Sequence, residues 1–199
     1  MRQARVARKT RETNIQVAWN LDANSQAAVR TGVAFLDHML TLLATHGAFA
    51  LSVKAAGDLE VDTHHTNEDV GLVMGEALLK ALGDCRGIQR FGWAYVPMEE
   101  AMARVVLDVS GRPKLVMRDL RRPRARLQGS GTAYQWQDLE HWLESFARAA
   151  KLTVHVDVFA GEDFHHTCEA VFKALGRALA QAVQRNPRVK GIPSSKGRL

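Results

Sequence analysis

A five-residue motif occurs twice in this chain, and its repetition limits the possible folds more than any other feature. Residues 64–68 (HHTNE) return as residues 165–169 (HHTCE), 101 positions later. A shorter piece repeats with a similar offset, because residues 36–40 (LDHML) match residues 139–143 (LEHWL). Each half therefore carries three histidines and one glutamate in the same order. Further along, Gly75, Ala77 and Leu78 recur as Gly176, Ala178 and Leu179. The simplest interpretation is a duplicated half-domain that binds metal.

Helical geometry indicates how each motif places its ligands. Neighbouring residues on an α-helix point about 100° apart, whereas residues four apart lie on nearly the same face. His64 and Glu68 should therefore share a face while His65 points elsewhere, and the second motif should repeat this arrangement. Such a pair can chelate one ion and lend its middle histidine to another. The eight predicted ligands are His38, His64, His65, Glu68, His141, His165, His166 and Glu169.

This ligand set limits the kind of metal site. Six imidazoles and two carboxylates are too many for one closed tetrahedral ion and suit two octahedral ions with open positions. The ligand types permit zinc, iron, manganese or nickel, and carboxylates with open octahedral positions favour manganese. A catalytic His–Glu dyad without metal is the alternative. Cys168 stands where the first motif has Asn67, and we expect it to be a packed helix residue rather than a ligand.

Composition and charge fit an ordinary globular chain. Its 199 residues are 46% hydrophobic and 24% charged, enough for a substantial core. The longest apolar stretch, residues 35–53, is interrupted by Asp37, His38 and His46, so we expect no membrane span. Residues 1–10 lack the apolar segment of a secretory signal and the two cysteines give no disulfide framework, which favours the cytoplasm. The net charge of +6 fits an anionic partner, either nucleic acid or a phosphorylated small molecule.

Hydrophobic periodicity predicts an α+β protein in which each half runs strand–strand–helix–strand–strand–helix. Strands are expected at residues 5–10, 13–19, 51–53, 59–61, 95–97, 101–109, 114–117 and 152–158. Helices are expected at 32–46, 64–82, 138–150 and 163–184, with Gly47 as a stop signal and Asp62 or Thr63, then Asp163, as N-caps. Residues 118–132 are basic and should form a mobile loop. One domain, 1–199, would comprise halves at about 1–90 and 91–185 and a polar tail at 186–199.

Several cationic and hydroxyl side chains are candidates for binding phosphate. Arginine beside glycine allows close approach and bidentate contact with a phosphate group. Taken singly, each candidate is more often a solvated surface group, and the same holds for Glu12 as a proton shuttle. The basic run at 118–126 permits a nucleic-acid interpretation, which we discount because no aromatic interleaving or recognised module accompanies it. The phosphate candidates are Arg90, Arg112, Lys173, Ser194, Ser195 and Lys196.

These motifs together resemble imidazoleglycerol-phosphate dehydratase. The resemblance rests on residues 35–40 (FLDHML), 45–47 (THG), both HHxxE motifs, 110–113 (SGRP), 172–174 (FKA) and 193–197 (PSSKG), and it extends from residue 8 to 197. It implies a hydro-lyase of histidine biosynthesis that dehydrates imidazole glycerol phosphate to imidazole acetol phosphate with two Mn²⁺ per active site. It also implies a ribosomal protein S5 domain 2-like fold, with helices between two four-stranded sheets. The expected assembly is a homo-oligomer, a 24-mer built from trimers, with active sites at subunit interfaces.

Carried over residue by residue, the resemblance makes the eight histidines and glutamates above the metal ligands. Glu12 matches the acid–base glutamate, which would move a proton between the substrate carbon and the leaving oxygen. The substrate positions would be Glu12, His46, Arg90, Arg112, Lys173, Ser194, Ser195 and Lys196, all but Glu12 and His46 near the phosphate. Thr63 replaces a frequent aspartate, Trp142 replaces a phenylalanine, and the 118–132 loop is unusually basic. None of these departures removes a ligand.

Two other functional classes use the same residue types. A di-metal phosphatase would direct a metal-bound hydroxide at the phosphate ester and release inorganic phosphate. A metal-storage protein would saturate its ions with protein ligands and would need neither Glu12 nor the tail that contains Lys196. We favour the dehydratase interpretation over both of these because neither explains the joint pattern of motifs.

Overall fold

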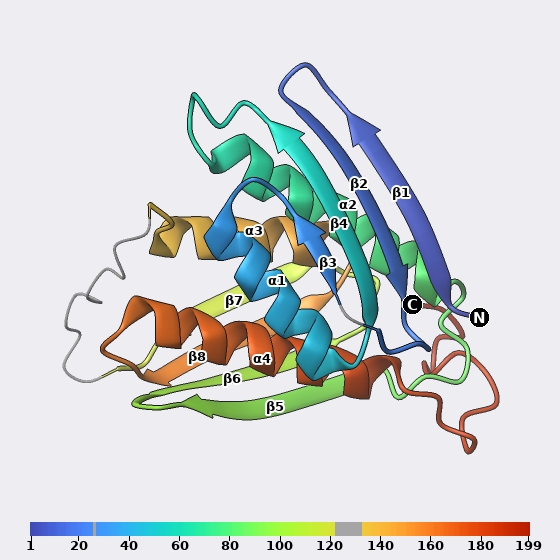
Figure 1. Cartoon of the computed structure of the whole chain (residues 1–199). Helices are drawn as coiled ribbons and strands as arrows, with labels where there is room; N and C mark the ends of the chain where they lie inside the picture. The colour runs from blue at the N-terminus through green and yellow to red at the C-terminus, as the bar shows by residue number, and fades with distance from the viewer. Residues whose placement is uncertain (26, 122–132) are drawn as a thin grey trace.

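The computed structural model describes residues 1–25, 27–121 and 133–199, and its helices lie between two four-stranded sheets (Figure 1). The first sheet has the order β1-β2-β4-β3 and contains β1 (Gln3–Lys9), β2 (Thr13–Asn20), β3 (Ala28–Arg30) and β4 (Ala50–Gly57). The second has the order β5-β6-β8-β7 and contains β5 (Phe91–Met98), β6 (Ala101–Asp108), β7 (Lys114–Asp119) and β8 (Thr153–Ala160). The helices are α1 (Ala34–Gly47), α2 (His64–Leu82), α3 (Trp136–Ala149) and α4 (Phe164–Val183). The predicted duplicated α+β fold is confirmed.

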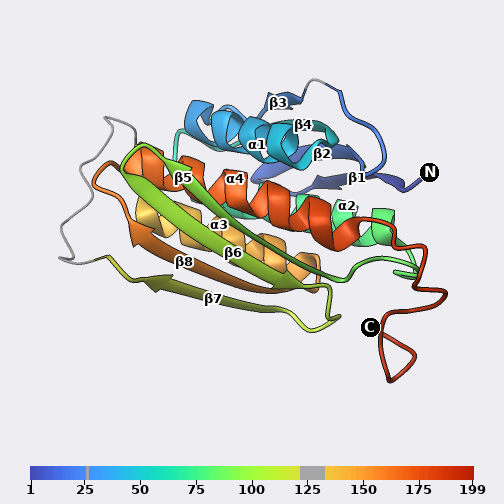
Figure 2. The same cartoon turned by 90° about the horizontal axis from the view of Figure 1, so that it is seen from below.

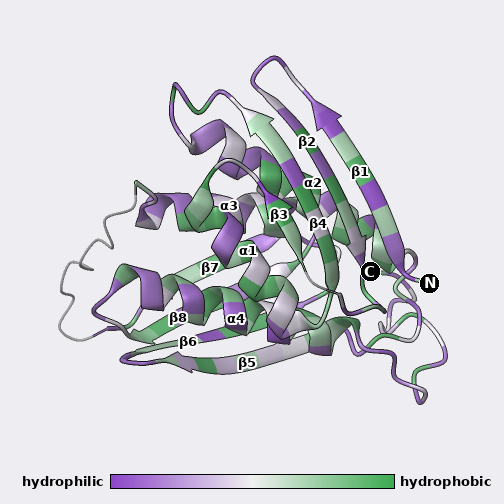
Figure 3. Ribbon diagram, viewed as in Figure 1, coloured by the Kyte–Doolittle hydropathy of each residue, from purple (hydrophilic) through white to green (hydrophobic). Residues whose placement is uncertain are grey.

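The two sheets are copies of one topology. In each sheet, the three strand pairings are antiparallel, antiparallel and parallel in sheet order. The parallel pairing is β3 with β4 in the first sheet and β7 with β8 in the second. One face of each sheet packs on the helices and the other faces outward, so buried and exposed residues alternate along β2 and β5. The same alternation is visible as hydropathy along β1 (Figure 3). The second sheet covers the helix layer from below (Figure 2).

The core between the sheets is aromatic at its centre. Trp142 stacks on Phe146 with ring centroids 5.1 Å apart, and Phe146 lies 6.2 Å from Trp19 of β2. All three side chains are almost completely buried, so α3 joins the helix layer to the first sheet through large apolar contacts. Within the described ranges, no helix is both long and apolar enough to cross a membrane.

The predicted order of elements within each half is wrong in one respect. Both halves run strand–strand–strand–helix–strand–helix, because β3 and β7 precede α1 and α3. Residues 59–61, predicted as a strand, form a turn, and the strand that pairs with β4 on that side is β3 instead. Leu59 and Val61 are 37% and 66% exposed, so their apolar character does not reflect a buried strand face. The three-residue β3 is too short to show an alternating pattern.

Most other boundaries agree with the predictions to within a few residues. Helix α1 ends at Gly47 as expected, although Ala48 takes the left-handed conformation that terminates it. Asp163 caps α4 by accepting from His166 N, and Asp62 accepts from His64 N at 2.7 Å at the start of α2. β5 starts four residues before the predicted strand. Of the predicted loop 118–132, residues 118 and 119 belong to β7, and 122–132 lie outside the described residues.

Two glycines of the repeat explain how the helices approach one another. A Cβ on Gly75 of α2 would lie 2.6 Å from the carbonyl oxygen of Phe146 in α3, and one on Gly176 of α4 would lie 2.4 Å from that of Leu43 in α1. The repeat therefore encodes two equivalent close crossings, α2 on α3 and α4 on α1. Each crossing brings one HHxxE motif against a helix that carries a single repeated histidine.

We expect Gly176→Ala to lower the free energy of unfolding by about 1–3 kcal/mol, because the added methyl group meets backbone atoms that cannot rotate away. Urea unfolding followed by circular dichroism measures the change. Gly191→Ala is the matched control, since a Cβ there would meet nothing within 4 Å. Equal stability of the two variants would contradict the close crossing.

Candidate metal centre

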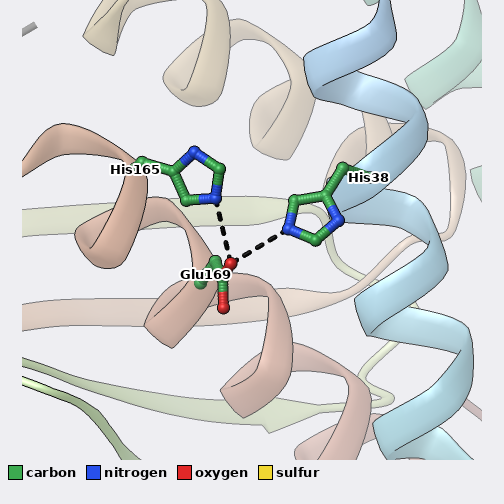
Figure 4. Close-up of side chains that lie close together, drawn as sticks. All are labelled: His38, His165 and Glu169. Atoms are coloured by element: carbon green, nitrogen blue, oxygen red, sulfur yellow. Dashed lines mark hydrogen bonds and ion pairs between the residues drawn. The ribbon is translucent and has the colours of Figure 1, made fainter. Parts of the chain in front are cut away.

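The crossing of α1 and α4 assembles a histidine–glutamate cluster, which we call the α1–α4 cluster: His38, His165 and Glu169. His38 Nε2 lies 2.9 Å and His165 Nε2 lies 3.0 Å from the same oxygen, Oε1 of Glu169 (Figure 4). One potential ligand atom from each residue falls within 4.8 Å of the others. Two imidazole nitrogens and a carboxylate that converge at this spacing have the donor set and the proximity to hold one divalent cation.

The charge on Glu169 is stabilised by its surroundings. Lys173 Nζ, one helical turn further along, donates to Glu169 Oε2 at 2.5 Å. Burial acts to raise the pKa of Glu169, but the hydrogen bonds from Lys173, His38 and His165 outweigh it and lower that pKa to about 2. Glu169 is therefore an anion at neutral pH, the form in which a carboxylate ligates a metal.

The crossing of α2 and α3 assembles the equivalent α2–α3 cluster: His64, Glu68 and His141. His64 Nε2 lies 3.5 Å from Glu68 Oε2, and the rings of His64 and His141 are 5.0 Å apart. Arg148 of α3 contacts the other oxygen of Glu68 at 3.4 Å, so each glutamate has a cationic neighbour. These residues line a pocket of about 200 Å³. This cluster is looser than the α1–α4 cluster and more exposed.

The middle histidine of each motif points to a carboxylate outside the repeat. His65 Nδ1 lies 2.9 Å from Asp58 Oδ2, and His166 Nδ1 lies 2.8 Å from Glu100 Oε2. The hydrogen bond with Asp58 raises the pKa of His65, and the one with Glu100 raises the pKa of His166. The predicted split, in which the outer histidine and the glutamate share a face and the middle histidine does not, is confirmed in both motifs.

Glu12 lies in the turn between β1 and β2, beside the start of α2. Thr13 Oγ1 donates to the buried Asp69 of α2 at 2.5 Å, which fixes the turn against that helix. The Asp58 backbone N–H donates to the carbonyl oxygen of Glu12 at 3.2 Å. The Glu12 carboxylate is close enough to His65 to contribute, after the Asp58 hydrogen bond, to the raised pKa of that histidine. The predicted proton-transfer residue, Glu12, is thus close to a predicted ligand, His65.

The predicted substrate-binding residues other than Glu12 fall in two regions. Arg90 is held by Asp108 at 2.7 Å and donates to the carbonyl oxygen of Pro193 at 2.8 Å, which attaches the C-terminal tail beside β5 and β6. Arg112 lies exposed in the β6–β7 turn, and the neighbouring Gly111 packs against the terminal residue of the tail. Ser194, Ser195 and Lys196 follow in the same tail.

Lys173 and His46 belong to the other region, next to the α1–α4 cluster. His46 lines a pocket of about 320 Å³ together with Trp93 and Arg177. Burial lowers the pKa of His46, and the charges of Lys173 and Arg177 lower it further. The surroundings of His46 therefore favour its neutral form.

The sequence missed the residues that support these groups. Asp58, Glu100, Asp108 and Arg148 each pair with a predicted site residue, but none belongs to a repeated motif. Aligning the halves by their strands rather than by the histidines would have matched Glu100 to Glu12. Cys168 is fully buried, as expected for a packing residue.

Paired helices with matched histidine–glutamate clusters, set between sheets of identical topology, define a duplicated α+β domain with two candidate metal sites. A family model described as imidazoleglycerol-phosphate dehydratase matches residues 31–179. Over 197 residues the chain is 51% identical to the imidazoleglycerol-phosphate dehydratase of Thermoanaerobacter pseudethanolicus, with 99% of each chain covered. It is 50% identical to that of Bacillus subtilis, with 100% of each covered.

Solved structures agree with the sequence comparison. The crystal structure of the Pyrococcus furiosus enzyme in complex with (S)-C348 matches with a TM-score of 0.82 and 31% identity, covering 98% of this chain and 100% of that one. The Staphylococcus aureus imidazoleglycerol-phosphate dehydratase matches with a TM-score of 0.79 and 34% identity, covering 92% and 99%. The chain belongs to the imidazoleglycerol-phosphate dehydratase family.

Proposed function

We propose that this chain uses two Mn²⁺ ions, held by its repeated histidines and glutamates, to remove water from imidazole glycerol phosphate. The dehydration, a hydro-lyase reaction of histidine biosynthesis, follows from membership of the family. The observation that supports a metal is the convergence of His38 and His165 on one oxygen of the anionic Glu169. The α2–α3 cluster repeats the same three residue types, which supports a second ion.

The donor set fits this metal. Imidazole nitrogen and carboxylate oxygen are ligands that Mn²⁺ accepts, and an octahedral ion with open positions leaves room for substrate. Each cluster supplies three protein donors, so neither is closed by its own residues. When bound, the ions supply Lewis-acid stabilisation of the charge that develops on the imidazole ring of the substrate.

The chain's own residues account for the remaining requirements of the reaction. Glu12 takes the proton from the substrate carbon and returns a proton to the departing hydroxyl group on the neighbouring carbon, so that water leaves and an enol remains. The enol becomes imidazole acetol phosphate when its hydroxyl proton is lost and the carbon that carried the leaving group gains a proton. Arg90, Arg112 and the tail residues Ser194–Lys196 bind the phosphate. This remote binding holds the reacting carbon in position and converts binding energy into orientation.

We also propose that the working enzyme is a homo-oligomer in the cytoplasm, a 24-mer built from trimers, in which neighbouring subunits complete each site. In support, His65 and His166 point away from the clusters of their own chain, which leaves them available to a neighbour. The outward face of β5 and β6 also exposes large apolar side chains, a feature of protein interfaces. These are Phe91, Trp93, Tyr95, Met102 and Val106, between 36% and 57% exposed.

Product analysis tests this function. We expect purified protein supplied with Mn²⁺ to convert imidazole glycerol phosphate to imidazole acetol phosphate without releasing inorganic phosphate. Inorganic phosphate as the product would identify a di-metal phosphatase instead. Tight metal binding with no turnover, in a folded and assembled sample, would identify a storage protein. Both results would contradict the dehydratase.

A further inference from the structure

The hydrogen bonds of His65 and His166 determine which nitrogen of each ring keeps a free lone pair. Both pair through Nδ1 with a carboxylate, at 2.9 Å for Asp58 and 2.8 Å for Glu100. An ionised carboxylate only accepts hydrogen bonds, so Nδ1 carries the proton and Nε2 of the neutral ring keeps its lone pair. A carboxylate in this position is the arrangement that fixes the tautomer and orientation of histidines that ligate metals.

The two carboxylates come from different places in the two halves. A Cβ on Gly57 would lie 2.0 Å from Thr66 Oγ1 and 3.4 Å from Thr13 Cγ2. A Cβ on Gly161 would lie 2.3 Å from Thr167 Oγ1 and 3.4 Å from Ala101 Cβ. Gly57 thus lies between Thr66 and Thr13 in the same way as Gly161 lies between Thr167 and Ala101. Because Thr66 and Thr167 occupy the same position of the repeated motif, Thr13 and Ala101 occupy equivalent positions in the two halves.

This equivalence matches Glu12 with Glu100, since each immediately precedes the first residue of β2 or β6. The environments of the two glutamates differ. Glu100 accepts hydrogen bonds from His166 and from the backbone N–H groups of Glu162, at 3.1 Å, and Asp163, at 2.9 Å. The exposed Glu12 carboxylate makes no hydrogen bond or ion pair with any residue in the described ranges.

The connections before α2 and α4 explain the difference. Residues 58–63 join β4 to α2, whereas only residues 161–163 join β8 to α4. The longer connection supplies Asp58 to His65. In the shorter one, the Asp163 carboxylate caps α4 by accepting from His166 N at 3.1 Å. The ring of His166 is held by the hairpin glutamate, Glu100, instead.

We infer that Glu100 and Asp58 are positioning residues, which hold His166 and His65 with Nε2 free to ligate a metal, and that Asp58 thereby leaves Glu12 free for proton transfer. Equivalent positions of the two halves thus have two different roles: Glu100 orients a ligand in the second half, and Glu12 is left for the reaction in the first. The metal-ligating part of this inference rests on the proposed function.

The variant Glu100→Gln tests the inference sharply. Glutamine would keep its carbonyl oxygen on the N–H groups of residues 162 and 163 and turn its amide NH₂ toward His166, which reverses the hydrogen bond. We expect the neutral His166 ring to change from the Nδ1–H to the Nε2–H tautomer, measured by solid-state ¹⁵N NMR of histidine-labelled, metal-free protein at alkaline pH. The signal is assigned by its loss in His166→Gln. Glu99→Gln, in the same turn, removes an equal charge and should leave the tautomer unchanged.

Metal affinity supplies the second measurement. Calorimetric titration with Mn²⁺ should show one of two sites weakened by about 10–100-fold in Glu100→Gln and in Asp58→Asn, and neither site weakened in Glu99→Gln or Glu12→Gln. An unchanged His166 tautomer in Glu100→Gln, or an Nε2–H ring in the unmodified protein, would overturn the positioning role. The tautomer measurement tests the positioning role in metal-free protein. Failure of the unmodified protein to bind Mn²⁺ would therefore contradict the proposed function and not the positioning role.

Discussion

Glu12→Gln is expected to lower kcat by about 10²- to 10⁴-fold, the usual contribution of a positioned acid–base group, while Mn²⁺ binding stays unchanged. The amide has nearly the same shape as the carboxylate but neither takes nor gives a proton at neutral pH. The exposed Glu12 carboxylate makes no hydrogen bond or ion pair with a described residue, so the substitution removes no such interaction from the fold. Steady-state turnover and Mn²⁺ titration on the same preparation measure the two effects.

Glu60→Gln is the matched control for this prediction. Glu60 is an exposed glutamate of the 58–63 connection, whose Asp58 N–H donates to the Glu12 carbonyl oxygen, and no reaction step uses Glu60. Its variant should retain full turnover. Turnover of Glu12→Gln within a few-fold of the unmodified protein would remove Glu12 from the mechanism.

Glu169→Gln is expected to abolish one metal site and lower turnover by at least about 100-fold, beyond the loss typical of a supporting residue. Its carboxylate is the acceptor shared by His38 and His165 and is also the partner of Lys173. With a neutral amide in its place, the Lys173 ammonium loses its anion and the two imidazoles lose the acceptor that joins them. Metal content per chain and turnover should therefore fall together.

Glu68→Gln makes the equivalent change in the α2–α3 cluster and should remove the other ion. Glu144→Gln is the control, because Glu144 lines the same pocket without belonging to the cluster. Loss of both ions in either glutamate variant would show that the two sites depend on each other. Full metal content in Glu169→Gln would exclude Glu169 as a ligand.

The repeat made most of the fold predictable. Duplicated motifs at a constant offset require two similar halves, and the periodicity around residues 64–82 and 164–183 located two helices closely. The sequence did not reveal β3, because three residues carry no period, or the turn at 59–61, whose apolar residues resemble a strand. Such short elements are defined by their pairing partners rather than by their own composition.

The sequence predicted how residues are arranged within each motif but not which residues from other elements join them. Helical spacing correctly predicted that Glu169 and His166 point in different directions, because both residues lie on one helix, α4. Which single histidine joins which motif depends on how α1 crosses α4 and α2 crosses α3, and the crossings depend on Gly176 and Gly75. Partners such as Glu100, in the turn between β5 and β6, lie far from the motif in the sequence, and no spacing rule links them to it.

The most direct test of metal-dependent dehydration is a titration of metal-stripped protein with Mn²⁺, with turnover of imidazole glycerol phosphate and bound metal measured at each step. We predict no turnover without metal and a rise in turnover that saturates at two Mn²⁺ per chain. Full turnover in the metal-stripped protein, confirmed to contain no residual metal, would contradict this prediction.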